Sequence, residues 1–219
     1  MKRKYLAAIM VFISLALIGC GHNYSSAPPP PSNIITQILS DARFDGDIQS
    51  SLTGTTVTQG NTQSVFVGID SATGAEFRAF LDFPLTGADG VPGNAVIVSA
   101  VLDIVIDRIL PQPLLGTIPI RIDLVSFQPP ILIPTDFDPT IQLALASTTN
   151  IPPISSADVG QHIFVDVTSL MDEAQIRGLP DFQVRILLDS NAVSGLIEIN
   201  DTTGRNRALL APLLQVEYI

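Results

Sequence analysis

Tryptophan, cysteine and histidine are scarce in this chain of 219 residues, and each shortage narrows the range of functions. The chain has no Trp, one Cys and two His. A single cysteine cannot form a disulfide within the chain, and His22 and His162 lie too far apart in sequence to form a zinc-ligand pair. The sequence also lacks a Gly-x-Ser-x-Gly motif. Because the usual nucleophile–base systems are missing, we expect a protein that is not an enzyme.

Positive charge is scarce beyond the first residues. Lys2, Arg3 and Lys4 supply three of the 11 basic residues. From residue 20 onward the chain therefore holds eight Arg against 21 Asp and Glu, a formal balance of −13. This acidity argues against nucleic acid and anionic lipid surfaces as partners. It is typical of a solvated protein outside the cytoplasm.

The N-terminus carries the pattern of an export signal. The three cations precede an apolar run from Leu6 to Ile18, which Ser14 alone interrupts. This run is shorter than the roughly 20 residues that a transmembrane helix needs. Its exit, Leu17-Ile18-Gly19-Cys20, resembles the lipobox of bacterial lipoprotein signal peptides. The alternative is an ordinary secretory signal with an incidental cysteine.

The lipobox resemblance implies a lipid anchor. Residues 1–19 would be removed as the signal peptide, and the Cys20 thiol would receive two acyl chains, often with a third on the new amine. Two or three chains anchor a protein stably, because each buried methylene contributes about 0.8 kcal/mol. The expected location is the cell envelope. Gly21 after the cysteine predicts the outer membrane if the host is Gram-negative.

The rest of the chain divides by composition. We expect residues 20–33 to be a tether, because Pro28–Pro31 favours a stiff polyproline II rod. Residues 34–54 form an N-terminal segment in which four apolar residues have helical spacing over a short run. Residues 55–219 form the main domain. Its length can bury a large core without disulfides.

The main domain alternates apolar and polar residues with a period of two. Alternation of this kind places one strand face on a core and the other in solvent, and turn residues separate the segments. The pattern predicts an all-β fold, an antiparallel β-sandwich with one short helix that begins at Thr168 or Ser169 and ends at Gly178. Phe80 and Phe164 fall out of phase, so they would face a second layer or an exposed patch. The alternating segments are 77–83, 96–106, 120–124, 163–167, 184–188 and 214–218.

The order of these segments is similar to that of the DNRLRE domain family. The segments that carry the resemblance are Arg78–Phe83, Ile97–Leu102, Val165–Thr168, Val184–Leu188 and Pro212–Tyr218, and the similarity covers residues 55–219. It implies a jelly-roll-like sandwich of a secreted or cell-surface protein with an adhesive or accessory role, and some relatives bind polysaccharide. The chain lacks the family's Trp before the Asp-Val-Thr strand and has instead Gly160–Phe164. It also has a long, Pro-rich stretch from Leu110 to Pro153.

Two loops are candidates for a site. The turn after residue 199 concentrates amides and arginines, and loops at sandwich ends often carry function. The alternative is a hairpin whose arginines pair with local acids. Asp136 and Asp138 flank Phe137 in the Pro-rich stretch and could supply oxygens to calcium, whereas Asp also favours turns by bonding its own backbone. The candidate ligand residues of the first loop are Asn200, Asp201, Thr202, Arg205 and Arg207.

Three functions remain open. The first is a non-enzymatic, membrane-anchored lipoprotein for adhesion or envelope assembly, whose partners are the membrane, through the Cys20 lipid, and an envelope protein. The second is a carbohydrate-binding module for cell-wall or extracellular polysaccharide, marked by a strip of aromatic side chains on the surface beside a groove. The third is a calcium-dependent or carboxylate-based hydrolase, which needs two facing carboxylates about 5–9 Å apart in a cleft.

Overall fold

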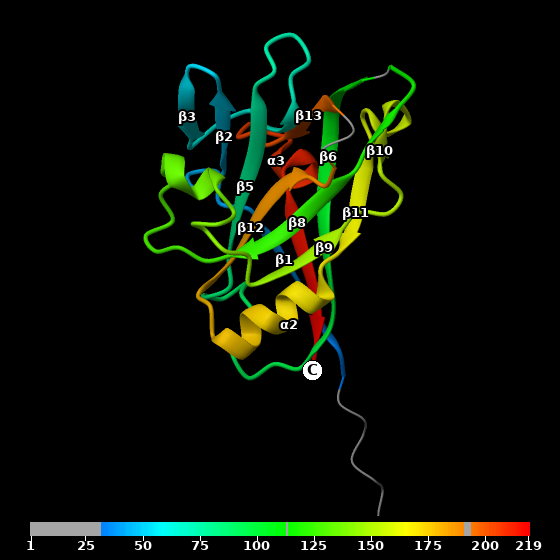
Figure 1. Cartoon of the computed structure of the whole chain (residues 1–219). Coiled ribbons are helices and arrows are strands. Elements are labelled where there is room, and N and C mark those ends of the chain that lie inside the picture. Colours follow the sequence, from blue (N-terminus) through cyan, green and yellow to red (C-terminus); the bar gives the residue numbers. More distant parts are fainter. Residues whose placement is uncertain (1–31, 113, 191–193) are drawn as a thin grey trace, which may run out of the picture. The chain divides into compact units, whose positions relative to one another are not determined.

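The computed structural model describes residues 32–112, 114–190 and 194–219, and Ser32–Ile219 form one compact unit (Figure 1). The strands are β1 (Ile34–Leu39), β2 (Gly46–Ser51), β3 (Gly54–Gln59), β4 (Ser64–Ile69), β5 (Glu76–Pro84), β6 (Ile97–Gln112), β7 (Thr117–Ile118), β8 (Ile120–Val125), β9 (Ala146–Thr149), β10 (Ile154–Ser155), β11 (His162–Asp166), β12 (Asp181–Leu188), β13 (Ser194–Asn200) and β14 (Leu213–Tyr218). The helices are α2 (Thr168–Arg177) and α3 (Arg207–Leu210), with short 3-10 turns η1 (Pro134–Phe137) and η2 (Ser156–Asp158).

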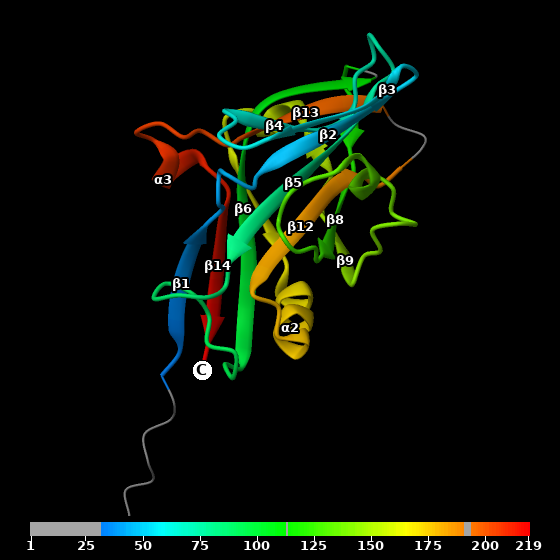
Figure 2. The same cartoon turned by 90° about the vertical axis from the view of Figure 1, so that its left-hand side faces the viewer.

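One antiparallel sheet curls into two layers, which confirms the expected all-β sandwich. Its strand order is β1-β14-β6-β13-β4-β5-β12-β8-β9, and β2, β3 and β11 branch from this path. The long strand β6 joins the layers, because its first half pairs with β14 and β11 and its second half with β13. Figure 2 shows β1, β14 and β6 on one side and β5, β12 and β8 on the other.

The core between the layers follows the predicted alternation. Leu102 of β6, Val184 of β12 and Leu214 of β14 are fully buried in one apolar cluster. The prediction fails at the start of β6, where the Val98 side chain is exposed. A register shift between Glu217 and Tyr218 of the neighbouring β14 lies opposite this end. A bulge of this kind changes the face toward which the following side chains point.

Residues 34–54 belong to the sandwich and are not a separate segment. β1 pairs along its whole length with β14, from Ile34 opposite Tyr218 to Leu39 opposite Leu213. β2 pairs with both β3 and β5. The helical spacing of the isoleucines is therefore overridden by strand pairing, because the free edge of β14 supplies backbone partners for all six residues of β1.

The expected helix forms as α2. Gly178 ends it in the left-handed conformation, with φ 62°, which glycine adopts without steric cost. Leu170 and Ala174 are buried as expected, but Ile176 is exposed and Met171 is buried in its place. Residue 176 lies six positions after residue 170, a rotation of about 240° around the helix, so it points away from the sheet.

The Pro-rich stretch covers the outer face of the second layer. Phe80 and Ile48 form a second buried cluster with Leu132 from this stretch, so Phe80 faces a second layer. Arg185 of β12 is fully buried and holds the stretch in place. Its Nη1 donates to the carbonyl oxygen of Gln142 at 2.9 Å, and its Nη2 donates to Asp123 at 2.8 Å.

Candidate functional site

Two strand edges face each other across a hollow at the open seam of the sandwich. β9 pairs only with β8, and β11 pairs only with β6, among the strands that the structure describes. The hollow between them has a volume of about 530 Å³, and a smaller one of about 250 Å³ continues it along β11. We call the two hollows together the β11 groove. Its lining residues are Thr148, Thr149, Asn150, Ile151, Pro152, Asp158, His162, Ile163, Phe164, Val165, Asp166, Thr168, Ser169 and Asp172.

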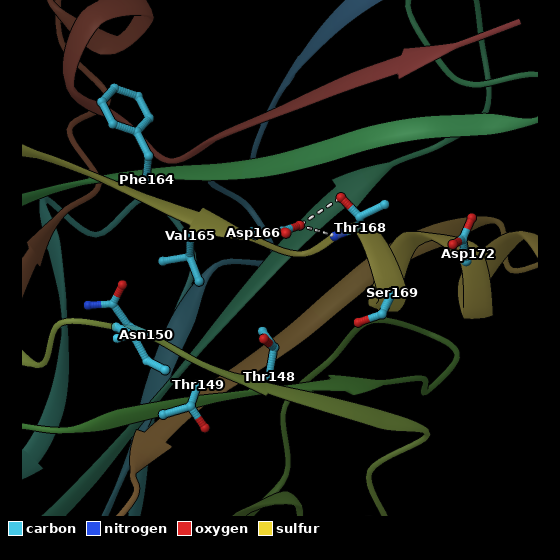
Figure 3. Close-up of a pocket in the computed structure, with 10 residues that line it drawn as sticks. Thr148, Thr149, Asn150, Phe164, Val165, Asp166, Thr168, Ser169 and Asp172 are labelled. Carbon is cyan, nitrogen blue, oxygen red and sulfur yellow. Dashed lines mark hydrogen bonds between the residues drawn. The ribbon is translucent and has the colours of Figure 1, made fainter.

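Strand alternation decides which side chains reach the groove. Figure 3 shows Val165 directed toward Asn150 and Thr148, whereas the Phe164 ring turns away from them. Val165 is almost fully buried, and the Phe164 side chain is 65 % exposed. Phe164 is therefore the aromatic rim of the groove, and the threonines and Asn150 form its polar wall.

The end of the groove is shaped by the start of α2. Asp166 Oδ1 accepts hydrogen bonds from the Thr168 backbone N–H at 2.9 Å and from Thr168 Oγ1 at 2.6 Å. These two hydrogen bonds, the side-chain one foremost, lower the pKa of Asp166. Asp166 thus accepts a hydrogen bond from the backbone N–H of Thr168, the first residue of α2, whereas Val167 at the N-cap makes no side-chain capping hydrogen bond. The carboxylate stays ionised at neutral pH.

A second polar face adjoins Phe164 on the outer side of the first layer. The His162 ring stacks against the Phe164 ring, with centroids 6.1 Å apart and an interplanar angle of 13°. His162 Nδ1 shares a hydrogen bond of 2.9 Å with Asp103 Oδ1. A further hollow of about 400 Å³ lies beside Phe164 and is lined by Gln37, Val101, Asp103, Leu213 and Gln215. Phe164 therefore stands between hollows on both of its sides.

The charge of the groove has one sign. Its lining contains the carboxylates of Asp158, Asp166 and Asp172 and no Lys or Arg. The remaining polar groups are hydroxyls, amides and the imidazole of His162, all of which donate or accept hydrogen bonds. This composition can bind hydrogen-bonding and cationic groups, and it repels anions.

The loop after β13 is part of the fold and not an open ligand loop. Asn200 Nδ2 donates to Asp107, and Asp201 is fully buried. Arg207 Nη1 donates to Asp201 Oδ1 at 3.2 Å and to the Thr202 carbonyl at 3.0 Å. Arg205 is exposed and has no ion-pair partner among the described residues. The sequence left open the alternative that arginines of this loop pair with local acids. Arg207 does so, because it forms an ion pair with Asp201.

Arg207 also reaches a pair of buried carboxylates. Its Nη2 lies 4.0 Å from Asp45 Oδ2, and Thr62 Oγ1 donates to Asp201 Oδ2 at 2.9 Å. Burial raises the pKa of Asp45 well above its usual range, and the Asp201 carboxylate raises it further. Burial also raises the pKa of Asp201, against the effect of Thr62 and Arg207. These acids are enclosed by protein and do not face a cleft.

Asp136 and Asp138 serve the turn that contains them. Asp136 Oδ2 accepts from the Ile133 N–H at 2.8 Å, and Asp138 Oδ1 accepts from the Thr140 N–H at 2.8 Å. The backbone bond from Thr140 lowers the pKa of Asp138. No group of three or more His, Cys, Asp or Glu side chains within residues 32–112, 114–190 and 194–219 could hold a metal ion. The turn interpretation accounts for both aspartates.

The sequence indicates only part of the groove. Phe164 stood out because it breaks the alternation of its strand, but Thr148, Thr149, Asn150 and Asp172 carried no local signal. Their common role depends on β9 and β11 meeting at the seam, which is a property of the topology. Cys20 lies outside the described residues. Compared with models of protein families and with curated proteins, the chain matches none.

Proposed function

We propose that this protein is a membrane-anchored, non-enzymatic lipoprotein of the cell envelope whose sandwich binds a partner in adhesion or envelope assembly through the β11 groove. The observation that carries the proposal is the groove itself, about 530 Å³ in its larger part, which lies in the size range of ligand sites. It runs along two unpaired strand edges and has an exposed aromatic rim.

The anchor rests on the sequence from Lys2 to Cys20 and on the similarity of residues 17–20 to a lipobox. No helix in the part of the chain that the structure describes is long and apolar enough to cross a membrane. The element that we propose for membrane attachment is a lipid on Cys20, on the strength of the sequence before it. The tether with Pro28–Pro31 would then hold the sandwich away from the surface.

The chemistry of the groove supports binding over catalysis. A glycoside hydrolase needs one carboxylic acid that is protonated and one carboxylate across the bond. Asp166 is held ionised by its hydrogen bonds with Thr168, so it is a poor general acid. The acids with raised pKa, such as Asp45 and Asp82, lie in the interior. They cannot reach a polymeric substrate.

The proposed function is tested by fatty-acid labelling followed by fractionation. Wild-type protein should incorporate a clickable fatty acid and fractionate with membranes. Cys20→Ser should lose the label and appear uncleaved or soluble. A Cys20→Ser protein that still carries the label would show that the anchor is elsewhere. For the sandwich, Phe164→Ala should retain the wild-type urea midpoint, because its ring is exposed, while adhesion or envelope integrity declines.

A carbohydrate-binding module is the second candidate, and the exposure of Phe164 favours it. Sugar rings stack on exposed aromatic faces with hydrogen-bonding groups nearby, and amides from Gln37 and Gln215 lie beside this ring. Phe80 cannot serve this role, because it is buried. With a single exposed aromatic ring among the residues that the structure describes, we expect weak or no binding to soluble polysaccharides. Micromolar binding to a neutral glycan on an array, lost in Phe164→Ala, would promote this candidate above the first.

A further inference from the structure

The free edge of β11 presents backbone groups that no described strand uses. The Val167 N–H donates to the Ala100 carbonyl of the neighbouring chain segment at 2.9 Å. In an antiparallel pair, successive residues direct their N–H and C=O groups to opposite sides. Val165 and Ile163 therefore bond toward β6, in register with Leu102 and Ile104. The backbone groups of the residues between them point away from β6.

Those outward groups belong to Phe164, Asp166 and His162, and they face the groove. The opposite wall follows the same rule. The Asn150 N–H donates to the Ile120 carbonyl at 3.1 Å, so Thr149 directs its backbone groups away from β8. The groove thus has unpaired donors and acceptors along both of its walls.

The two strands at this edge also lack Lys and Pro, two of the residues that protect sheet edges. Natural sheets block their edges with Lys, Pro, bulges or a covering segment, because an open edge pairs with other chains. β11 has the sequence His-Ile-Phe-Val-Asp and β9 has Ala-Ser-Thr-Thr, with neither Lys nor Pro. The other edge of the same layer, β1, has contact with a loop, since Thr36 Oγ1 donates to the Asp89 carbonyl at 2.8 Å. An edge left open beside a groove has the properties of a binding site.

We propose that the β11 groove binds an extended polypeptide as an added strand, with cationic side chains at alternate positions. This deepens the proposed function by naming the class of partner. An added strand would bond to the backbone of Phe164 and Asp166. One set of its side chains would lie beside the Phe164 ring, where Lys or Arg gains a cation–π contact and the nearby carboxylate of Asp103. The other set would enter the hydroxyl-rich seam above Val165.

The acidic lining selects for cations. The groove carries three carboxylates and no Lys or Arg, and the chain from residue 20 onward has a formal balance of −13 from eight Arg and 21 acids. The negative charge of the groove increases the rate at which a cationic peptide encounters it, and the same charge disfavours acidic peptides. The chain's own Pro28–Pro31 segment is a poor occupant, because proline has no N–H to donate to the ladder.

The test uses the full chain in detergent micelles and a peptide of alternating Lys and Val matched to the five residues of β11. Binding is measured by calorimetry, and backbone amide exchange is followed at Phe164 and Asp166. We expect saturable binding with slowed exchange at these two amides. A peptide N-methylated at every second amide keeps its side chains but loses one edge of donors. Two such peptides can be made, one for each set of alternate amides. The peptide that lacks the N–H groups facing β11 should bind more than about tenfold more weakly than the parent peptide.

Charge-reversal variants test the acidic wall. Asp172 is exposed, lines the groove and makes no side-chain hydrogen bond within the described residues, so Asp172→Lys should fold normally and weaken binding about fivefold. Asp89→Lys makes the same charge change on an exposed loop outside the groove and should leave binding unchanged. If both variants weakened peptide binding equally, the effect would come from the net charge of the protein. That result would overturn the proposed site.

Three results would overturn strand addition. They are no binding up to about millimolar peptide, equal affinity of both N-methylated peptides and the parent, and no change in exchange at Phe164 and Asp166. Self-association through β11, seen as a dimer whose formation slows these same amides and excludes the peptide, would also overturn it in favour of a second copy. None of these results affects labelling at Cys20. Failure here and failure of the proposed anchor are therefore distinguishable.

Discussion

The carboxyl of Asp82 gives a quantitative test of the interior, because it is buried with little compensation. Its side chain is 5 % exposed, and Oδ1 accepts one hydrogen bond from Gln183 Nε2 at 2.8 Å. Burial raises the pKa of Asp82 to about 6, from 3.8. The folded state therefore holds this proton more tightly than the unfolded state. Its contribution to stability is present below pH 4 and is lost as pH rises through 6.

The magnitude follows from the gap between the two pKa values. A gap of about two pKa units corresponds to about 3 kcal/mol at pH 8, since each unit is about 1.4 kcal/mol. Asp82→Asn removes the charge and keeps an oxygen to accept from Gln183. We expect this variant to be about 1–3 kcal/mol more stable than wild type at pH 8 and close to wild type at pH 4. Urea unfolding followed by circular dichroism at both pH values measures the difference.

Asp89→Asn is the matched control, because Asp89 is exposed and its removal should leave the pH dependence unchanged. Asp47 should add to the decline in wild type, since burial raises its pKa to about 6 as well. The reasoning would be refuted if wild-type stability rose between pH 5 and pH 7. It would also be refuted if Asp82→Asn were less stable than wild type at pH 8.

The remaining predictions concern the core, the Pro-rich stretch and sorting. Leu102→Ala should destabilise the domain by about 2–5 kcal/mol, because Leu102 is fully buried, and an unchanged urea midpoint would contradict its place in the core. Arg185→Ala should lower the free energy of unfolding by about 3–5 kcal/mol, because it leaves the buried Asp123 without this ion-pair partner. Urea unfolding measures this change, and a stability near that of wild type would contradict it. In a Gram-negative host, wild type should fractionate with the outer membrane and Gly21→Asp with the inner membrane, and wild type found only in the inner membrane would refute the sorting rule.

The sheet could be predicted from the sequence because apolar residues at alternate positions mark the buried face of each strand. This worked for β6 from Ala100 to Ile106 and for β12, where the apolar set is buried. It failed for β1, whose isoleucines also fit a helix, because short apolar runs do not distinguish the two periods. It failed again at Val98, where the bulge in the β14 pairing changes the face. A bulge depends on the partner strand, so the local alternation of apolar and polar residues does not reveal it.

The site was less predictable than the fold. Asn200 to Arg207 has the composition of an open loop, but Asp201 and Arg207 bond to segments far away in sequence, which local composition cannot reveal. The groove depends on two edges, β9 and β11, that meet only after the sheet has curled. Among the groove residues Phe164 alone gave a signal, because it lies on the polar phase of its strand. Phe80 has the same phase, but the Pro-rich stretch buries it.

The central claim is that a lipid on Cys20 holds this sandwich at a membrane, and mass spectrometry of the N-terminal peptide tests it most directly. The protein is isolated from membranes of its host, digested and analysed for its first residue. The account predicts a peptide that begins at Cys20 and carries the added mass of two or three acyl chains. A peptide that begins elsewhere, or that begins at Cys20 with an unmodified thiol, would contradict it.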